Sequence, residues 1–188
     1  MRKAANPKRS PLRDVLEIVI TIAIVLFVTA ALKLFVIDVY TVPTGSMTPT
    51  IALNDRIFAE KISPHFHNIQ PQEVVTFTDP EDSTRILVKR VIAIGGQVLD
   101  LRDGTVYVNG VALDEPYTHG EPSYPLDTLA GNVGIKFPYT IPDGMIWVMG
   151  DNRTDSLDSR YFGPIAETDV LARAIGIVWP LSHFGGFH

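Results

Sequence analysis

One uncharged apolar run near the N-terminus constrains the fold of this chain more than any other feature. Residues 18–32 carry no charge, and after a single cation at Lys33 the apolar stretch continues to Ile37. At about 1.5 Å per residue, some twenty helical residues span a hydrocarbon core of about 30 Å. Lys33 is near enough to the end of the run for its ammonium to reach the interface. The run therefore predicts a transmembrane helix over residues 15–37.

The charges on either side of this run predict its orientation. Residues 1–13 hold five basic residues and no acid, whereas residues 38–188 hold ten basic residues against nineteen acids. Because basic flanks stay on the cytoplasmic side, we expect residues 1–14 in the cytoplasm and residues 38–188 outside the plasma membrane. The alternatives are a cleaved secretory signal, with an apolar region of about 7–15 residues, and a buried core helix. The total length of the run favours a retained single-pass anchor, and nothing downstream looks able to pack around a core helix.

After Asp38 the sequence changes to short extended segments separated by turns. The chain has 14 Gly and 14 Pro, which suit strands and turns better than a helical bundle. Residues about 97–144 are predicted to form a smaller, hairpin-rich subdomain, because Asp103-Gly104 and Asn109-Gly110 are typical hairpin turns. The predicted fold is mostly β, an antiparallel, barrel-like sheet domain behind one N-terminal transmembrane helix. Its expected strands are residues 39–42, 56–62, 73–78, 84–94, 98–101, 105–108, 145–149 and 172–179.

The composition excludes several kinds of chemistry. Without Cys there are no disulfides, thiolate metal sites or cysteine nucleophiles, and a net charge of −5 argues against a nucleic-acid partner. The pair His65-x-His67 follows Pro64 and has no carboxylate nearby, which predicts a surface loop rather than a metal site. No His lies in the segments that carry chemistry, which disfavours a Ser-His-Asp enzyme. We therefore expect no metal, nucleotide or other cofactor.

Two short segments hold residues suited to nucleophilic catalysis. Pro43 and Pro49 stiffen the segment around Ser46, as the geometry of a nucleophile requires, although a plain turn uses the same residues. Lys89 shares a strand face with apolar residues, and burial there would lower its pKa and make it a base. The alternative is an edge-strand lysine or one paired with an acid. Arg90, on the opposite face, is expected to form an ion pair.

A third segment, residues 150–163, is polar and follows a buried strand. Asp158 and Arg160 are two residues apart, so on an extended chain they share a face and can form a pair. As an exposed loop such a segment needs no special role. If residues 150–163 are instead buried against the first two segments, this polar segment needs a specific role there.

Together the three segments resemble bacterial type I signal peptidases in their short, single-span form. The matching motifs are Gly-Ser-Met-x-Pro-Thr, then Lys-Arg with trailing Gly-Gly, then Gly-Asp-Asn-Arg-x-x-Ser-x-Asp-Ser-Arg. The resemblance runs from the helix to about Gly163, and the layout extends it to nearly the whole chain. Two residues depart from the pattern: Asn54 stands where the family usually has Gly, and Gln97 where Asp commonly follows the glycines.

The resemblance implies a membrane-bound serine endopeptidase that removes signal peptides from exported preproteins. It implies cleavage after small residues of the Ala-x-Ala type, preproteins and the lipid bilayer as partners, and no cofactor. Two alternatives remain: a self-cleaving Ser-Lys protease of the repressor type, which the membrane helix opposes, and an inactive anchored module that only holds preproteins. The implied site residues are Ser46 as nucleophile, Lys89 as general base, Thr44 and the Ser46 backbone N–H as the oxyanion hole, Ser156 as support for the lysine, and Asp158 with Arg160 as a structural pair.

Overall fold

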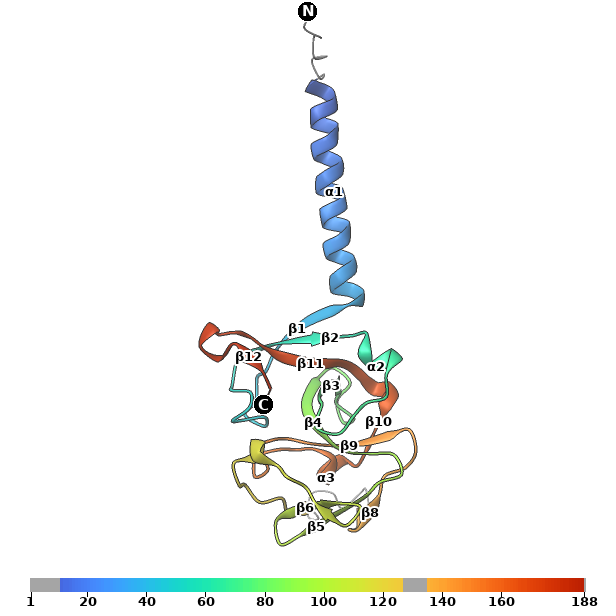
Figure 1. Ribbon diagram of the computed structural model, residues 1–188, viewed down its shortest axis with the longest axis vertical. Helices are drawn as coiled ribbons and strands as arrows, with labels where there is room; N and C mark the ends of the chain where they lie inside the picture. The colour runs from blue at the N-terminus through green and yellow to red at the C-terminus, as the bar shows by residue number, and fades with distance from the viewer. Residues whose placement is uncertain (1–10, 127–134, 188) are drawn as a thin grey trace, which may run out of the picture. The chain divides into compact units, whose positions relative to one another are not determined.

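The computed structural model describes residues 11–126 and 135–187, and it divides the chain into two compact units (Figure 1). The first unit is Met1–Val36 and the second is Ile37–His188. Four of the five basic residues at the N-terminus lie outside the described residues.

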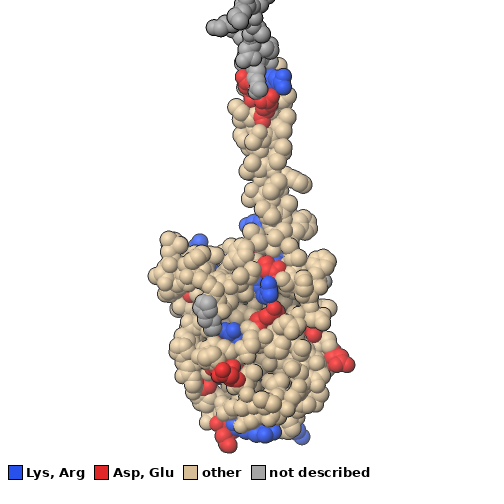
Figure 2. Space-filling view, viewed as in Figure 1, with Lys and Arg blue, Asp and Glu red and all other residues tan. Residues whose placement is uncertain are grey.

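Within the first unit, α1 (Pro11–Phe35) is apolar on every side. Its side chains, most of which are apolar, are exposed almost throughout. Pro11 occupies the first turn, where its missing N–H costs nothing, and Asp14 in that turn complements the helix dipole. In Figure 2 the charged side chains visible on α1 gather near its two ends. By length and composition α1 can cross a membrane, as expected of a single-pass anchor; the exact span 15–37 stays a prediction.

The second unit is built on an antiparallel sheet in the order β1-β2-β11-β3-β4-β9-β10, with β12 paired to β11 (Figure 1). A smaller sheet has the order β7-β6-β5-β8. The strands of both sheets are β1 (Ile37–Thr41), β2 (Arg56–Glu60), β3 (Val74–Thr78), β4 (Ile86–Ile94), β5 (Val98–Arg102), β6 (Thr105–Val108), β7 (Val111–Ala112), β8 (Tyr139–Thr140), β9 (Met145–Met149), β10 (Ile165–Ala166), β11 (Val170–Trp179) and β12 (Gly185–Gly186). The helical turns are α2 (Ser63–Phe66), η1 (Pro116–Thr118), α3 (Ser159–Phe162), η2 (Glu167–Asp169) and η3 (Leu181–His183).

Apolar side chains bury both faces of the large sheet and join it to the small one. Alternation along β3 sends Val74 and Val75 into two different clusters, one on each face. A third cluster packs Leu99 and Val106 of the small sheet against Trp147 of β9. The polar segment that follows β9 is therefore anchored to well-packed strands.

The mostly β, antiparallel fold predicted from the sequence is confirmed. The predicted hairpin turns have the required geometry, since Asp103, Gly104, Asn109 and Gly110 all have positive φ. The strand predicted over residues 56–62 ends earlier, at Glu60, because α2 begins at Ser63. The expected surface loop at residues 65–67 is partly this short helix.

Candidate active site

Ser46 lies in the loop that joins β1 to β2, residues 42–55. The loop is closed at its base, where the Val42 N–H donates to the Asp55 carbonyl at 2.9 Å. Met47 and Ile51 are fully buried and anchor the loop in the apolar cluster beneath it. The hydroxyl of Ser46 is thus carried by a segment with little freedom to move.

The side chains of Ser46 and Lys89 meet although 43 residues separate them. The distance from Lys89 Nζ to Ser46 Oγ is 2.5 Å, and the contact is buried. The Thr44 hydroxyl lies 3.4 Å from Ser46 Oγ, on the same side of the loop. The structure therefore brings together three of the residues singled out in the sequence.

Lys89 occupies an apolar position in the middle of the sheet. It is only 3% exposed, and Val75 stands directly opposite it on β3. Burial disfavours the ammonium and lowers the pKa of Lys89 from its ordinary value to about 8, although the charge of Asp158 opposes the shift. Near neutral pH a substantial fraction of this amine can therefore lose its proton.

Asp158 and Arg160 form the expected ion pair, and it is completely buried. Arg160 Nε and Nη2 each lie 2.9 Å from a carboxylate oxygen of Asp158. The carboxylate also accepts from the Gly150 N–H at 3.1 Å. Burial pushes the pKa of Asp158 upward, but the hydrogen bonds and charge of Arg160 outweigh it, and the pKa ends below its ordinary value. Through the Gly150 N–H, the pair joins the first residue of the third segment to residues 158 and 160 near its end.

Ser156 lies close to Gly150 and to the loop of residues 42–55 that carries Ser46. A Cβ on Gly150 would collide with Ser156 Oγ and with the Ser46 carbonyl oxygen, so only glycine fits there. Ser156 Oγ is buried and has no hydrogen-bond partner among the described residues. No hydrogen bond joins Ser156 to Lys89 among the described residues, so the implied role of Ser156 beside the lysine stays a prediction.

Asn152 was not singled out in the sequence, yet it forms hydrogen bonds with three residues of the loop that carries Ser46. Its backbone N–H donates to the Ser46 carbonyl at 3.1 Å. Its side-chain amide donates to the Gly45 carbonyl at 3.2 Å and to the Thr48 hydroxyl at 3.0 Å. The third segment therefore fixes the backbone on both sides of the hydroxyl.

Arg90, the neighbour of Lys89 on β4, forms a second buried ion pair with Asp151. Two guanidinium nitrogens of Arg90 reach the carboxylate at 2.8 and 2.6 Å, which confirms the ion pair expected for this arginine. The Thr50 hydroxyl donates to the same carboxylate at 2.5 Å. The centroid of the Tyr117 ring lies 4.0 Å from the guanidinium carbon of Arg90 and 5.8 Å from that of Arg153. These contacts tie β4, the loop and the third segment together.

A groove of about 380 Å³ leads away from Ser46 and Lys89. One wall is residues 40–44 and the other is residues 84–89. The first wall contains β1, the edge strand of the sheet. The second contains the start of β4, which pairs with β9 only from Arg90 onward, so within the described residues its other edge has no strand partner. Two unpaired strand edges, at the end of β1 and at the start of β4, thus form part of the groove walls.

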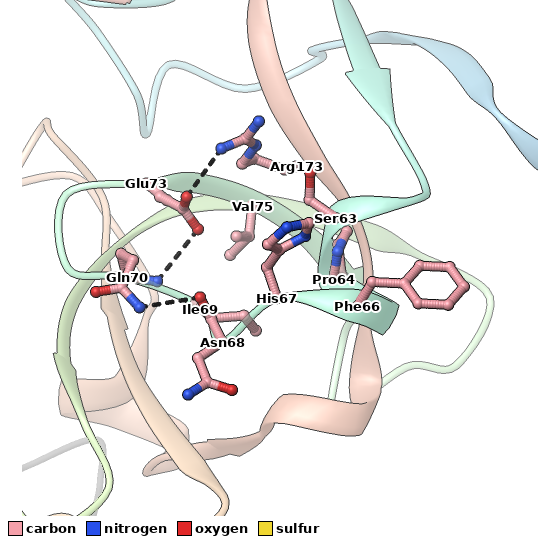
Figure 3. Close-up of a pocket in the computed structure, with 10 residues that line it drawn as sticks. All are labelled: Ser63, Pro64, Phe66, His67, Asn68, Ile69, Gln70, Glu73, Val75 and Arg173. Carbon is pink, nitrogen blue, oxygen red and sulfur yellow. Dashed lines mark hydrogen bonds and ion pairs between the residues drawn. The ribbon is translucent and has the colours of Figure 1, made fainter.

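A wider cavity of about 620 Å³ opens elsewhere, between α2 and the strands β3 and β11 (Figure 3). In it Glu73 accepts hydrogen bonds from Arg173 and from the Gln70 backbone. Neither Ser46 nor Lys89 lines it. This cavity is larger than the groove, but the contact between Ser46 and Lys89 makes the groove the candidate site.

The histidines do not form a metal centre in the part of the chain that the structure describes. Among the described residues, no group of three or more His, Asp or Glu side chains is placed to hold a metal ion. His67 is exposed, and the side chain of His65 lies outside the described part. His183 contacts Asp55 at 2.9 Å.

Both departures from the family pattern have a local explanation. Asn54 has a φ of 66°, a left-handed conformation that Gly adopts readily and that Asn tolerates better than most residues. Gln97 uses its side-chain oxygen to accept from the Ile94 N–H at 2.9 Å, as a shorter acid in this turn could. Both turns are therefore formed with the residues present.

A serine hydroxyl in contact with a desolvated lysine on a β scaffold defines a serine-type hydrolase. The family model described as signal peptidase, peptidase S26, matches residues 15–179. A probable signal peptidase I-1 of Synechocystis sp. is 32% identical, over 96% of this chain and 90% of that protein. Signal peptidase I of Mycobacterium tuberculosis is 34% identical, over 95% of this chain and 76% of that protein. Signal peptidase IB of Staphylococcus aureus is 31% identical, over 92% of this chain and 93% of that protein. The chain belongs to the type I signal peptidases of family S26, in the short form with one N-terminal apolar helix.

Proposed function

We propose that this chain removes N-terminal signal peptides from exported preproteins with a catalytic dyad of Ser46 and Lys89. The observation that carries the proposal is the buried contact of 2.5 Å between Lys89 Nζ and Ser46 Oγ. A serine hydroxyl becomes an effective nucleophile when a base accepts its proton. A lysine with a pKa of about 8 can be that base near neutral pH, whereas an ordinary lysine cannot.

The reaction follows from this geometry. Neutral Lys89 accepts the proton of Ser46 Oγ as the oxygen attacks the carbonyl carbon of the scissile bond. The ammonium of Lys89 then donates that proton to the leaving amine, and an acyl ester remains on Ser46. Lys89 next accepts a proton from a water molecule that attacks the ester carbonyl, and it returns this proton to Ser46 Oγ as the bond between Ser46 and the acyl group breaks. The Thr44 hydroxyl, 3.4 Å from Ser46 Oγ, and the Ser46 backbone N–H stabilise the oxyanion formed in each half of the reaction. Asp158 and Arg160 hold the segment beside the base in place, and Ser156 has its proposed role in supporting Lys89 through packing next to Gly150.

The substrate segment lies in the groove as an added strand. Two unpaired strand edges form part of the groove walls, and an extended peptide between them can make backbone hydrogen bonds on both sides. Successive side chains of an extended peptide point to opposite faces of the sheet, so the side chains of the first and third residues before the cut point to the same face. Val42 and Val88 line the groove and are packed into the protein, so they close it from below and leave room only for small side chains. This supports cleavage after small residues of the Ala-x-Ala type.

The direct test is cleavage of a preprotein by the full chain in detergent, beside its Ser46→Ala variant. We expect the wild type to release the signal peptide after an Ala-x-Ala sequence. The variant should lose activity by about 10³-fold or more, since it lacks the nucleophile. Equal cleavage by the variant would exclude Ser46 as nucleophile. Retention of the preprotein without any cleavage by the wild type would instead support the inactive binding module.

We also propose that residues 1–14 are cytoplasmic, 15–37 span the plasma membrane and 38–188, with a subdomain at about 97–144, lie outside. The proposal rests on the basic N-terminal flank and on the apolar helix α1. Protease added to intact spheroplasts should digest the part after Asp38 and spare an epitope placed before residue 14. Protection of the part after Asp38 would reverse the orientation.

Exposed apolar side chains on the second unit support contact of this domain with lipid. The strands β1, β2 and β11 are hydrogen-bonded neighbours, and the residues around them expose large apolar groups. Exposed apolar groups on neighbouring strands are a common feature of surfaces that meet lipid or a partner. The residues are Val39, Leu53, Ile175, Trp179, Leu181 and Phe184.

A further inference from the structure

Asp55 closes the loop that carries Ser46. Its backbone carbonyl accepts from the Val42 N–H, and its carboxylate oxygen Oδ2 accepts from the Ala52 N–H at 2.9 Å. Its own N–H donates to the Ala52 carbonyl at 3.1 Å. Asp55 is only 1% exposed, so its carboxylate has little access to water and depends on protein partners.

The second oxygen of this carboxylate is held by His183. The distance from His183 Nδ1 to Asp55 Oδ1 is 2.9 Å, and the two residues lie 128 positions apart in the chain. Among the described side chains, no other one contacts this oxygen. His183 belongs to η3, which follows the last long strand, and its side chain is 45% exposed. An accessible imidazole thus completes the bonding of a buried carboxylate.

The segment that carries His183, residues 181–187, is itself fixed in place. β12 pairs with β11 at Gly176 and Ile177, and the Gly185 carbonyl packs so close to Gly176 that no Cβ fits there. Phe187 packs against the cluster that also contains Met47 and Ile51 of the nucleophile loop. This segment lies beyond residues 15–179, which the family model matches.

We propose that His183 is a positioning residue for the dyad. By donating to Asp55 it fixes a carboxylate that holds the Ala52 N–H, on the residue whose backbone carbonyl closes residues 42–55. This holds the Ser46 hydroxyl and backbone N–H in their places. The proposal rests on the proposed function, because its effect on rate passes through Ser46. Neither Asp55 nor His183 lines the groove, so substrate binding does not depend on the contact.

The test uses the full chain with His183→Ala, His183→Asn and, as a matched control, His67→Ala. His67 is exposed and lines the other cavity. Loss of a hydrogen bond to a charged acceptor should lower kcat about 5- to 10-fold in His183→Ala. KM should stay within about twofold, because the groove is intact. His183→Asn should restore kcat, since its amide nitrogen takes the place of Nδ1, and His67→Ala should match the wild type.

A second measurement separates this proposal from the proposed function. Deuterium uptake by peptides covering residues 42–55 should rise in His183→Ala and return to the wild-type level in His183→Asn. Unchanged uptake and kcat in His183→Ala would overturn the positioning role, as would failure of His183→Asn to restore both. Faster uptake in every strand would also overturn it, because it would mean general destabilisation. If the wild type cleaves no preprotein, the proposed function fails, while the uptake comparison still decides the role of His183.

Discussion

Lys89→Arg is expected to lower kcat/KM for preprotein cleavage by about 10³-fold or more. A guanidinium does not lose its proton in a protein, so the variant keeps a cation beside Ser46 but has no base. A positioned general base contributes about 10²–10⁴ in rate, and Lys89 is the only basic side chain in contact with the hydroxyl among the described residues. Initial rates of signal-peptide release measure the effect.

Lys61→Arg is the control for this experiment. Lys61 forms an ion pair with Asp38 at 3.0 Å and is not in the groove. Its replacement should leave the rate within a few-fold of the wild type, since an exposed or half-exposed pair contributes little. Cleavage by Lys89→Arg at more than a tenth of the wild-type rate would remove Lys89 from the role of base.

Asp158→Ala is expected to lower the free energy of unfolding by about 3–5 kcal/mol, because it leaves the buried Arg160 without its partner. It also removes the acceptor of the Gly150 N–H and the cap of α3. At about 2–4 °C per kcal/mol for a domain of this size, the melting temperature should fall by about 10 °C. Activity should fall as well, because Gly150 packs against Ser46.

The matched control is Arg102→Ala, which breaks an ion pair at the surface. Arg102 is 54% exposed and pairs with Asp100 at 2.6 Å. Such a pair contributes about 0–1 kcal/mol, so the melting temperature should change by no more than a few degrees. Equal melting temperatures for Asp158→Ala and the wild type would contradict a structural role for the buried pair.

Local patterns were sufficient to predict most of the strands and the hairpins. Period-two alternation and turn residues with positive φ act within a few positions, so β5, β6 and β9 were found nearly to the residue. The short helices α2 and α3 were missed, because four residues carry no periodic signal. The order of the strands in the sheet depends on long-range pairing and could not be read from such patterns.

Within the site, the motifs pointed to the right residues but not to their partners. Ser46 and Lys89 were singled out by chemistry and by resemblance. In the folded chain, the loop between β1 and β2 brings Ser46 against Lys89 on β4. The role of Asn152 could have been suspected, since it lies inside the third motif. The contacts of Asp55 with His183 and of Tyr117 with Arg90 span long stretches of sequence and carry no local signal. Such contacts are visible only in the folded chain.

The proposed chemistry depends on the protonation state of one amine, so the pH dependence of kcat/KM for preprotein cleavage tests it most directly. This ratio reports the ionisations of the free enzyme. Because the neutral amine is the active form and burial lowers the pKa of Lys89 to about 8, activity should rise with pH along a limb centred near that value. A limb near 6.5, typical of an imidazole, or one near 10.4, typical of an unperturbed lysine, would contradict a desolvated Lys89 as the base.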